Sequence, residues 1–224
     1  MFEFLTLQNL PEVQSELVRP PSSTRPAVRR LTDGTIRAVV KDFSTLGYLF
    51  RSTAGRFLVW RESKAYRRLS GVRGIPRLFR VIDGLALVIE EVPGRSLENL
   101  EREVRLPESF FDNLEALVER IHEKGVAHCD LKRAANTLLG EDGNPHIIDW
   151  GAAILKNEFR WYPLNLVFDR FLVDDRLAVV KLKMRHIPER VSPGDIERYS
   201  RRSRGEILVR TIRDRLRYLL QKVV

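Results

Sequence analysis

The sequence contains a single cysteine and no long apolar run. Cys129 is the only cysteine among 224 residues, so no intramolecular disulfide framework can form, and a reducing compartment is the simpler expectation. No stretch approaches the roughly 18 consecutive apolar residues of a membrane span. The first ten residues are apolar but lack the basic region and the small-residue cleavage site of a secretory signal. We therefore expect a cytoplasmic protein, with peripheral contact to the inner membrane left open.

The overall composition is that of a soluble globular protein. Hydrophobic residues make up 43% of the chain and charged residues 31%, both within the ordinary range for such proteins. A chain of this length can bury a core of its own, as one domain or as two small lobes. No internal repeat or low-complexity tract is present.

The positive charge is concentrated near the end of the chain. Residues 176–224 contain 14 Lys/Arg and 5 Asp/Glu, which equals the net charge of +9 for the whole chain, so the first 175 residues are neutral. A basic segment of this kind suggests an anionic partner, such as a phosphorylated glycan, an acidic lipid surface or a nucleic acid. The alternative is a solvated helix face.

The first part of the chain has the pattern of a small sheet. The prolines of residues 1–27 predict a mobile or loop-rich lead-in, which we place at residues 1–28. Residues 29–43 predict two short strands around a Thr-Asp-Gly turn. Two more strands are expected at 78–82 and 85–89, joined by Asp83-Gly84, a strong hairpin signal.

Helical patterns separate and follow these strands. Residues 44–70 favour helix, with a break near Gly55. From Leu106 to Gly125 the apolar residues again follow helical spacing. Short strands are expected at 137–139 and 146–148, and a last amphipathic helix at 204–223. We therefore divide the chain into a sheet-rich unit at 29–90 and a helical unit at 91–224 with basic C-terminal helices, an α+β plan with a cleft at the linker.

The segment from His128 to Gly151 carries the most informative chemistry. His128-Cys129-Asp130, then Asn136, then Asp149-Trp150-Gly151 follow the order in which kinases place a base and two magnesium ligands. Phosphoryl transfer needs the phosphates, the metal and the acceptor hydroxyl held in line, with their charge neutralised. Asp130 is the candidate base. Asn136 and Asp149 are the candidate Mg²⁺ ligands, because Mg²⁺ prefers a few hard oxygen atoms.

Further candidates surround this segment. Lys41 ends a β-branched strand and can pair with the α/β-phosphates, and Glu62, 21 residues later on a helix, can hold that lysine in an ion pair. Lys132 can stabilise charge on the transferred phosphate. Glu90 and Val92 lie where main-chain groups of a linker would bind adenine. We expect His128 to be structural, and each of these residues also has a plain surface or structural alternative.

Together these residues resemble the protein-kinase-like superfamily, and within it the small bacterial RIO-like and lipopolysaccharide core kinases. The resemblance covers residues 29–151 well and the rest loosely. The matching segments are 41–43, 61–62, 74–78, 91–97 and 125–131. The resemblance implies a two-lobed kinase-like fold, with a sheet-rich N-lobe and a reduced helical C-lobe, that uses ATP and Mg²⁺.

The sequence departs from the kinase pattern in three places. Asn136 lies six residues after Asp130, one more than usual, which a bulge would have to accommodate. No glycine-rich loop precedes Lys41, so Arg25, Arg29 or Arg30 would have to help cover the phosphates. No Ala-Pro-Glu segment follows Asp149, which weakens the case for a peptide substrate.

The function expected from the sequence is an ATP- and Mg²⁺-dependent kinase acting on a hydroxyl of a protein Ser/Thr or of a cell-envelope glycan sugar. Contact with an acidic membrane surface is a further expectation. The alternative is a pseudokinase that acts as a nucleotide-binding regulatory module. Nucleic-acid binding is disfavoured, because the basic tail lacks interleaved aromatic residues and any known binding motif.

Overall fold

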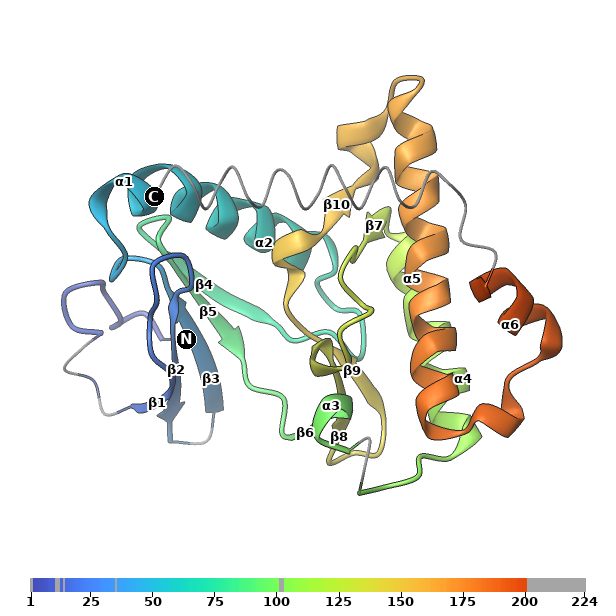
Figure 1. Ribbon diagram of the computed structural model, residues 1–224. Coiled ribbons are helices and arrows are strands. Elements are labelled where there is room, and N and C mark those ends of the chain that lie inside the picture. Colours follow the sequence, from blue (N-terminus) through green and yellow to red (C-terminus); the bar gives the residue numbers. More distant parts are fainter. Residues whose placement is uncertain (1, 11–12, 14, 35, 101–102, 201–224) are drawn as a thin grey trace. The chain divides into compact units, whose positions relative to one another are not determined.

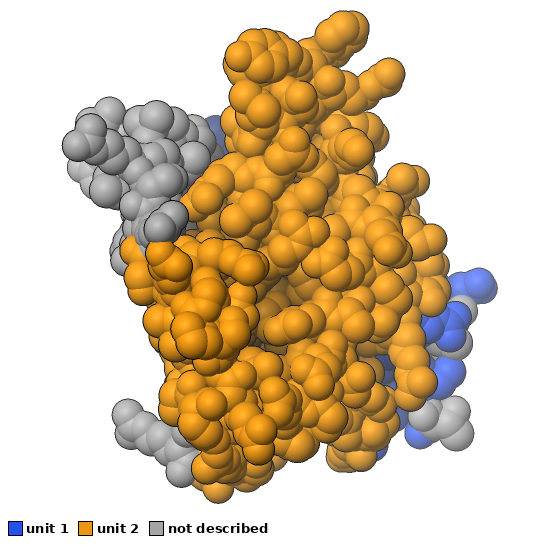
Figure 2. Space-filling view, turned by 90° about the vertical axis from the view of Figure 1, so that its right-hand side faces the viewer, with its two compact units in different colours: residues 1–63, 77–91, 202–224 blue, residues 64–76, 92–201 orange. Residues whose placement is uncertain are grey.

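The computed structural model of the chain (Figure 1) describes residues 2–10, 13, 15–34, 36–100 and 103–200. These residues form two compact units, coloured separately in Figure 2. Unit 1 contains residues 1–63 and 77–91, and unit 2 contains residues 64–76 and 92–200. The chain is of mixed α and β structure, as the sequence predicts. The helix predicted at 204–223 lies outside the described residues.

Unit 1 is built on a five-stranded antiparallel sheet in the order β1-β2-β3-β5-β4. Its strands are β1 (Glu16–Arg19), β2 (Ala27–Asp33), β3 (Ile36–Asp42), β4 (Leu78–Ile82) and β5 (Ala86–Glu90). The two predicted hairpins are confirmed, since β2 pairs with β3 and β4 pairs with β5. Their turns need the left-handed backbone, with φ of +65° at Gly34 and +67° at Gly84. The pairing of β3 with β5 joins the two hairpins into one sheet.

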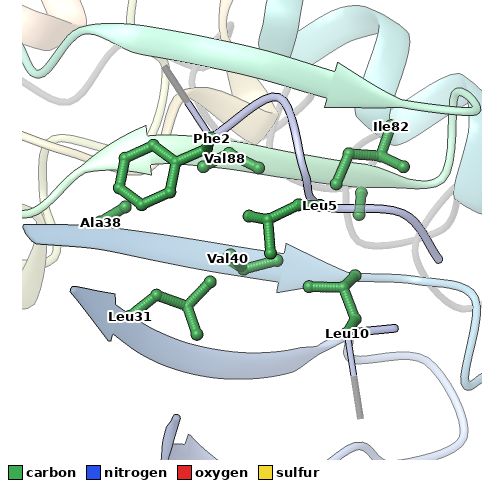
Figure 3. Packing of buried hydrophobic residues seen from close by; sticks show 9 residues of the cluster. Phe2, Leu5, Leu10, Leu31, Ala38, Val40, Ile82 and Val88 are labelled. Atoms are coloured by element: carbon green, nitrogen blue, oxygen red, sulfur yellow. The ribbon is translucent and has the colours of Figure 1, made fainter. Parts of the chain in front are cut away.

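The first ten residues cover one face of this sheet. Phe2, Leu5 and Leu10 are buried and pack on side chains from four strands (Figure 3). The sheet residues of this cluster are Leu31, Ala38, Val40, Ile82, Ala86 and Val88. The prediction of a loop-rich lead-in therefore missed β1 and this apolar segment, because prolines mark turns but do not show what the apolar residues between them cover.

One continuous helical run follows β3. It consists of α1 (Tyr48–Phe50), a π-helical turn (Arg51–Gly55) and α2 (Arg56–Arg68), and the residues of α2 after Ser63 belong to unit 2. The predicted break near Gly55 is present as the π-helical turn. Phe50, Gly55 and Val59 are buried, which fixes the inner side of the run.

Unit 2 combines helices with two small antiparallel sheets. Its main helices are α4 (Glu108–Glu123) and α5 (Leu164–His186), which lie against each other (Figure 1). The remaining elements are β6 (Gly94–Ser96), α3 (Leu97–Leu100), β7 (Val126–Ala127), β8 (Thr137–Gly140), β9 (Pro145–Ile147), β10 (Ile154–Leu155) and α6 (Pro193–Ser200), with 3₁₀ turns at Ala134–Asn136, Trp150–Ala152, Lys156–Phe159 and Pro188–Arg190. The sheets are ordered β6-β8-β9 and β10-β7.

Helix α4 forms where its apolar periodicity predicts it. Pro107 precedes its first turn and Glu108 lies in that turn, both favourable at a helix start. Its buried face includes Phe110, Leu114, Leu117, Val118 and Ile121. Gly125, with φ of +71°, ends the helix and leads into β7. None of the described helices combines the length and apolar character needed to cross a membrane.

Gly74 joins the start of unit 2 to its three-stranded sheet. Its carbonyl oxygen accepts a hydrogen bond from the Ile147 N–H at 2.9 Å. With φ of +92°, a Cβ at this position would lie 2.8 Å from Leu117 Cδ2 and 2.9 Å from the Pro145 oxygen. Only glycine fits this close approach, which helps to hold the strand before Asp149.

Candidate active site

The predicted ion pair between Lys41 and Glu62 is present in unit 1. Lys41 Nζ lies 2.6 Å from Glu62 Oε1, and the side chain of Glu62 is 4% exposed. Alternation along β3 places Lys41 on the face opposite Ala38 and Val40, the residues that the N-terminal segment covers. The lysine is thus held on a central strand by a carboxylate from the inner side of α2.

Two of the three arginines expected to help cover the phosphates, Arg29 and Arg30, have other partners. The Arg30 side chain lies on the Lys41 face of the sheet, because Arg30 pairs with Val39 and Val39 lies two residues from Lys41. Its guanidinium contacts Glu16 at 2.6 Å and Glu91 at 2.5 Å. The hydrogen bond with Glu16 and the charge of Glu91 raise the pKa of Arg30. Arg29 donates a hydrogen bond to the Ser15 hydroxyl at 3.3 Å, so neither side chain is poised for phosphate.

Glu90 and Val92 lie at the end of β5 and just after it. The Glu90 carboxylate accepts the Arg77 N–H at 2.9 Å, and the Glu90 N–H donates to the Arg77 oxygen at 2.8 Å. The side chain of Glu90 therefore fixes the start of β4. Within the described residues, the main chain of Val92 takes part in no backbone hydrogen bond outside the strands. A main-chain role in adenine binding stays a prediction for both residues.

In unit 2, the carboxylate of Asp175 on α5 holds the loop that begins at His128. Asp175 is 2% exposed. Its Oδ2 accepts the His128 N–H at 2.7 Å, and its Oδ1 accepts the Cys129 N–H at 3.0 Å. His122 Nε2 donates to the same carboxylate at 3.3 Å. Cys129 has φ of +65°, a conformation unfavourable for a side chain with a Cβ, and the two loop hydrogen bonds stabilise it.

His128 has a structural place in this loop, as the sequence led us to expect. It is 1% exposed, and its Nε2–H donates to the Ile148 oxygen at 3.0 Å. Its Nδ1 accepts the Asp130 N–H at 3.3 Å. The ring also packs on Trp150, with the centroids 4.6 Å apart. His128 thus connects the Asp130 loop to the segment that contains Asp149.

Asn136 is brought to Asp130 despite the extra residue between them. Asn136 Nδ2 donates to the main-chain oxygen of Asp130 at 3.0 Å, and Asn136 is 3% exposed. The 3₁₀ turn Ala134–Asn136 accommodates the extra residue, since the Asn136 N–H bonds the Arg133 oxygen at 2.9 Å. The expected bulge is therefore a helical turn that leaves the amide in reach of the loop.

Asp149 directly follows a residue whose main chain is hydrogen-bonded to that of Asn136. The Ile148 N–H donates to the Asn136 oxygen at 3.0 Å, one residue before Asp149. Asp149 has φ of +66°, a left-handed conformation that aspartate tolerates better than most residues. Trp150 is fully buried after it and packs edge-on against Tyr66. The predicted packing of this aromatic ring in the core is present.

Asp130 and Lys132 lie on the partly exposed side of the loop. The Asp130 side chain is 32% exposed, and Arg133 Nη1 is 3.7 Å from its Oδ2. The main-chain oxygen of Lys132 accepts a hydrogen bond from Lys181 on α5 at 3.4 Å. The Asp130 carboxylate is thus partly exposed, and the main chain two residues after it is tied to α5.

Asn136 and Asp149 fit a magnesium ion in chemical terms. Because Asn136 Nδ2 is committed to the Asp130 oxygen, Oδ1 is the amide atom left for a ligand. Mg²⁺ in phosphoryl-transfer sites takes one or two protein oxygens and completes its shell with water and phosphate oxygens. No cluster of three or more His, Cys, Asp or Glu suited to a metal occurs in the described part of the chain, and this type of site does not need one.

Asp175 and His122 are the site residues that the sequence analysis missed. Asp175 lies within Val173-Asp174-Asp175-Arg176, where nothing in the sequence shows which of the two carboxylates is fully buried. His122 lies near the end of α4, six residues before His128. Helical spacing from the apolar residues of α4 could have placed His122 on the buried side.

Comparisons with known proteins point to kinases over a short stretch. No family profile matches the chain. A stretch of 48 residues, 21% of the chain, is 58% identical to the serine/threonine-protein kinase PknD of Chlamydia trachomatis serovar D. The corresponding protein of Chlamydia muridarum is 56% identical over the same length. The matched stretch is 5% of the length of these relatives. The similarity indicates a kinase-like relationship, and the narrower resemblance to RIO-like or lipopolysaccharide kinases stays a prediction.

Proposed function

We propose that this protein is an ATP- and Mg²⁺-dependent kinase that transfers the γ-phosphoryl group to a hydroxyl. The observation that carries the proposal is the hydrogen bond from Asn136 Nδ2 to the Asp130 oxygen, made within a loop that Asp175 anchors. This bond joins the loop of the candidate base to a candidate metal ligand, although the two residues are one position further apart than in the usual kinase pattern. The short similarity to serine/threonine kinases supports the same conclusion.

The residues of unit 2 supply the groups for the transfer itself. Asp130 orients the acceptor hydroxyl and takes its proton, with its backbone fixed by His128. Asn136 Oδ1 and the Asp149 carboxylate would hold Mg²⁺, which would supply positive charge to neutralise the phosphates. To the Lys132 ammonium we assign the stabilisation of charge on the transferred phosphate. The left-handed backbone of Cys129 and Asp149 orients these groups at both ends of the segment.

The residues of unit 1 supply a cation for the nucleotide. Glu62 holds the Lys41 ammonium at 2.6 Å, so that the long side chain needs little further ordering to bind the α/β-phosphates. Arg29 and Arg30 are not assigned this role. Arg29 pairs with Val40 and so lies on the face opposite Lys41, and Arg30 contacts two carboxylates, Glu16 and Glu91. A main-chain group of Glu90, at the end of β5, contributes to binding the adenine edge.

The acceptor is a protein Ser/Thr hydroxyl or a sugar hydroxyl of a cell-envelope glycan. The name of the matched relatives supports the first. The absence of an Ala-Pro-Glu segment after Asp149 supports the second, because that segment is part of the usual peptide-binding region. Both acceptors require the same Asp130 chemistry.

The direct test is transfer of labelled γ-phosphate to the protein itself, to a generic protein substrate and to a phosphorylated core oligosaccharide. We expect Mg²⁺-dependent transfer by the wild type and a loss of roughly 10²–10⁴-fold for Asp130→Ala and for Asp149→Ala. Asp169→Ala is the matched control, since Asp169 is an exposed carboxylate on α5 of the same unit. Equal transfer by wild type and Asp130→Ala would contradict the proposal.

The lack of a glycine-rich loop gives the pseudokinase alternative its basis. The turn between β2 and β3 offers only Gly34 where kinases place several glycines. A pseudokinase would show a rise in Tm with ATP and Mg²⁺ but no transfer to any acceptor. Binding would then be lost in Lys41→Met and kept in Asp130→Ala, which separates the two functions.

A further inference from the structure

The outer side of the helical run 48–63 in unit 1 exposes large apolar side chains. Tyr48 is 74% exposed and Leu49 62%, while Phe57 and Trp60 are 52% and 50% exposed. Isolated exposed apolar residues are common in soluble proteins, but a group of this size on one element marks an interaction surface. The run therefore has a surface that the proposed kinase chemistry does not use.

Four residues of α2 form a continuous patch, which we call the α2 outer face: Arg56, Phe57, Trp60 and Arg61. They occupy positions i, i+1, i+4 and i+5, which are neighbours on a helix. The rings of Phe57 and Trp60 lie 5.8 Å apart. The opposite side of the helix is buried at Val59, Glu62 and Ser63. In this part of α2, apolar residues therefore lie on both the buried and the exposed side, and the arginines lie on the exposed side.

All exposed charge on this run is positive. Glu62 is the only acidic residue between 44 and 63, and it is buried against Lys41. The cations are Arg51, Arg56 and Arg61. Arg51 donates to the Ser44 oxygen and lies over the Tyr48 ring, and Arg56 donates to the Asp83 oxygen. None of the three forms an ion pair with a carboxylate of the described residues, so their charge is available to an anionic partner.

We propose that the α2 outer face, together with Tyr48 and Leu49, binds a bilayer surface that contains acidic phospholipids. Such a surface offers phosphate groups to arginine and an apolar layer just below them to aromatic side chains and leucine. Trp and Tyr favour this interface because their rings are both apolar and polar. The inference goes beyond the proposed function and does not depend on it.

Two other occupants fit these observations less well. A nucleic acid would satisfy the arginines and stack on the rings, but it offers no aliphatic surface for Leu49. Residues 201–224 of this chain carry apolar residues at helical spacing, but they contain 8 Lys/Arg against 2 Asp/Glu. Their charge has the same sign as that of the α2 outer face, so repulsion disfavours them as its cover and favours a shared anionic partner.

The test is co-sedimentation of the full chain with vesicles of phosphatidylcholine, with and without phosphatidylglycerol. We expect binding to the acidic vesicles only, and weaker binding as the salt concentration rises. Phe57→Ser/Trp60→Ser and Arg56→Gln/Arg61→Gln should each weaken partitioning about tenfold or more. The matched control is Leu17→Ser/Val18→Ser, which changes two exposed apolar residues of β1 in the same unit and should bind as wild type.

Trp60 also reports binding directly. In a Trp161→Phe background the emission comes from Trp60 and from Trp150, which is fully buried. A blue shift with acidic vesicles alone is the expected result, and no shift would overturn the proposal. Equal binding to both vesicle types would also overturn it. So would loss of binding in Arg213→Gln/Arg217→Gln while both α2 variants bind as wild type, since the site would then be the tail.

Discussion

In unit 1 the candidate phosphate-binding lysine is held by a side-chain ion pair, whereas in unit 2 the candidate base is held through its backbone. Lys41 is positioned by Glu62 from a neighbouring helix, and both lie on regular elements. Asp130 follows two residues whose N–H groups converge on Asp175. The difference teaches that on a regular strand a side-chain contact is enough to orient a functional group, because the strand already fixes the main chain. A loop with left-handed residues needs a buried anchor for its main chain.

The largest effect is expected when that anchor is removed. Asp175→Ala leaves the N–H groups of His128 and Cys129 buried without an acceptor, so we expect the free energy of unfolding to fall by about 3–5 kcal/mol. Transfer activity should fall at least about 100-fold, because the loop before Asp130 loses its support. Urea unfolding followed by tryptophan fluorescence measures the first effect, and labelled phosphate transfer the second.

Asp175→Asn and Asp169→Ala sharpen this result. The amide introduced by Asp175→Asn would keep one acceptor oxygen, so an intermediate loss of stability is expected. Asp169→Ala, on the same helix, should change the free energy of unfolding by less than about 0.5 kcal/mol. A change below about 1 kcal/mol for Asp175→Ala would mean that the loop is held by other contacts.

Replacing the Lys41–Glu62 ion pair of unit 1 with two apolar side chains should preserve stability but abolish activity. Lys41→Met leaves the Glu62 carboxylate in a buried place without this cation, and we expect a loss of about 1–3 kcal/mol. Lys41→Met/Glu62→Met replaces both charges with apolar side chains and should recover to within about 1 kcal/mol of the wild type. Neither variant should transfer phosphate at more than about one hundredth of the wild-type rate.

The same chemical denaturation series tests this pair against Asp175. If the double variant stayed as unstable as Lys41→Met, the pair would be a structural anchor like Asp175, and the contrast between the units would be lost. If the double variant kept its activity, Lys41 would have no role in nucleotide binding.

The sequence was sufficient to predict the groups that stand on regular elements. Lys41 and Glu62 were paired because their order follows the kinase pattern, and the structure brings Lys41 Nζ to 2.6 Å from Glu62 Oε1. Both hairpins and α4 followed from turn residues and periodicity. The hairpins and α4 depend on local rules, which one sequence contains in full, whereas the ion pair depended on the kinase pattern.

Features that depend on long-range packing could not be read in the same way. Asp175 is 47 residues from His128 in the chain, and its burial follows from the packing of α5 on the loop. The cover of the sheet by Phe2, Leu5 and Leu10 likewise depends on a chain reversal that prolines alone do not specify. For the segment before Asn136, the sequence indicated only that a bulge must accommodate one extra residue. It did not indicate that this residue would be taken up in the 3₁₀ turn Ala134–Asn136.

The smallest loss of stability is expected for the ion pair of Arg176, the residue that follows Asp175 in the chain. Arg176 follows Asp175 on α5 but contacts Glu119 of α4, with Nε 2.6 Å from Oε1 and Nη2 2.9 Å from Oε2. Both side chains are about half exposed, so solvent weakens the pair, and Glu119→Gln should cost less than about 1 kcal/mol at neutral pH.

The pH dependence of that small effect gives it a clear signature. The hydrogen bond from Arg176 lowers the pKa of Glu119 in the folded protein. A lowered carboxyl pKa stabilises the fold above the ordinary value near 4.5, and the contribution is lost as the pH falls through the folded value. The difference between wild type and Glu119→Gln should therefore vanish in acid and shrink in high salt. A difference that persisted in acid would mean that Glu119 acts through packing. The contrast between Asp175, which acts as a buried hydrogen-bond acceptor, and Glu119, which acts through an exposed charge pair, would then no longer hold.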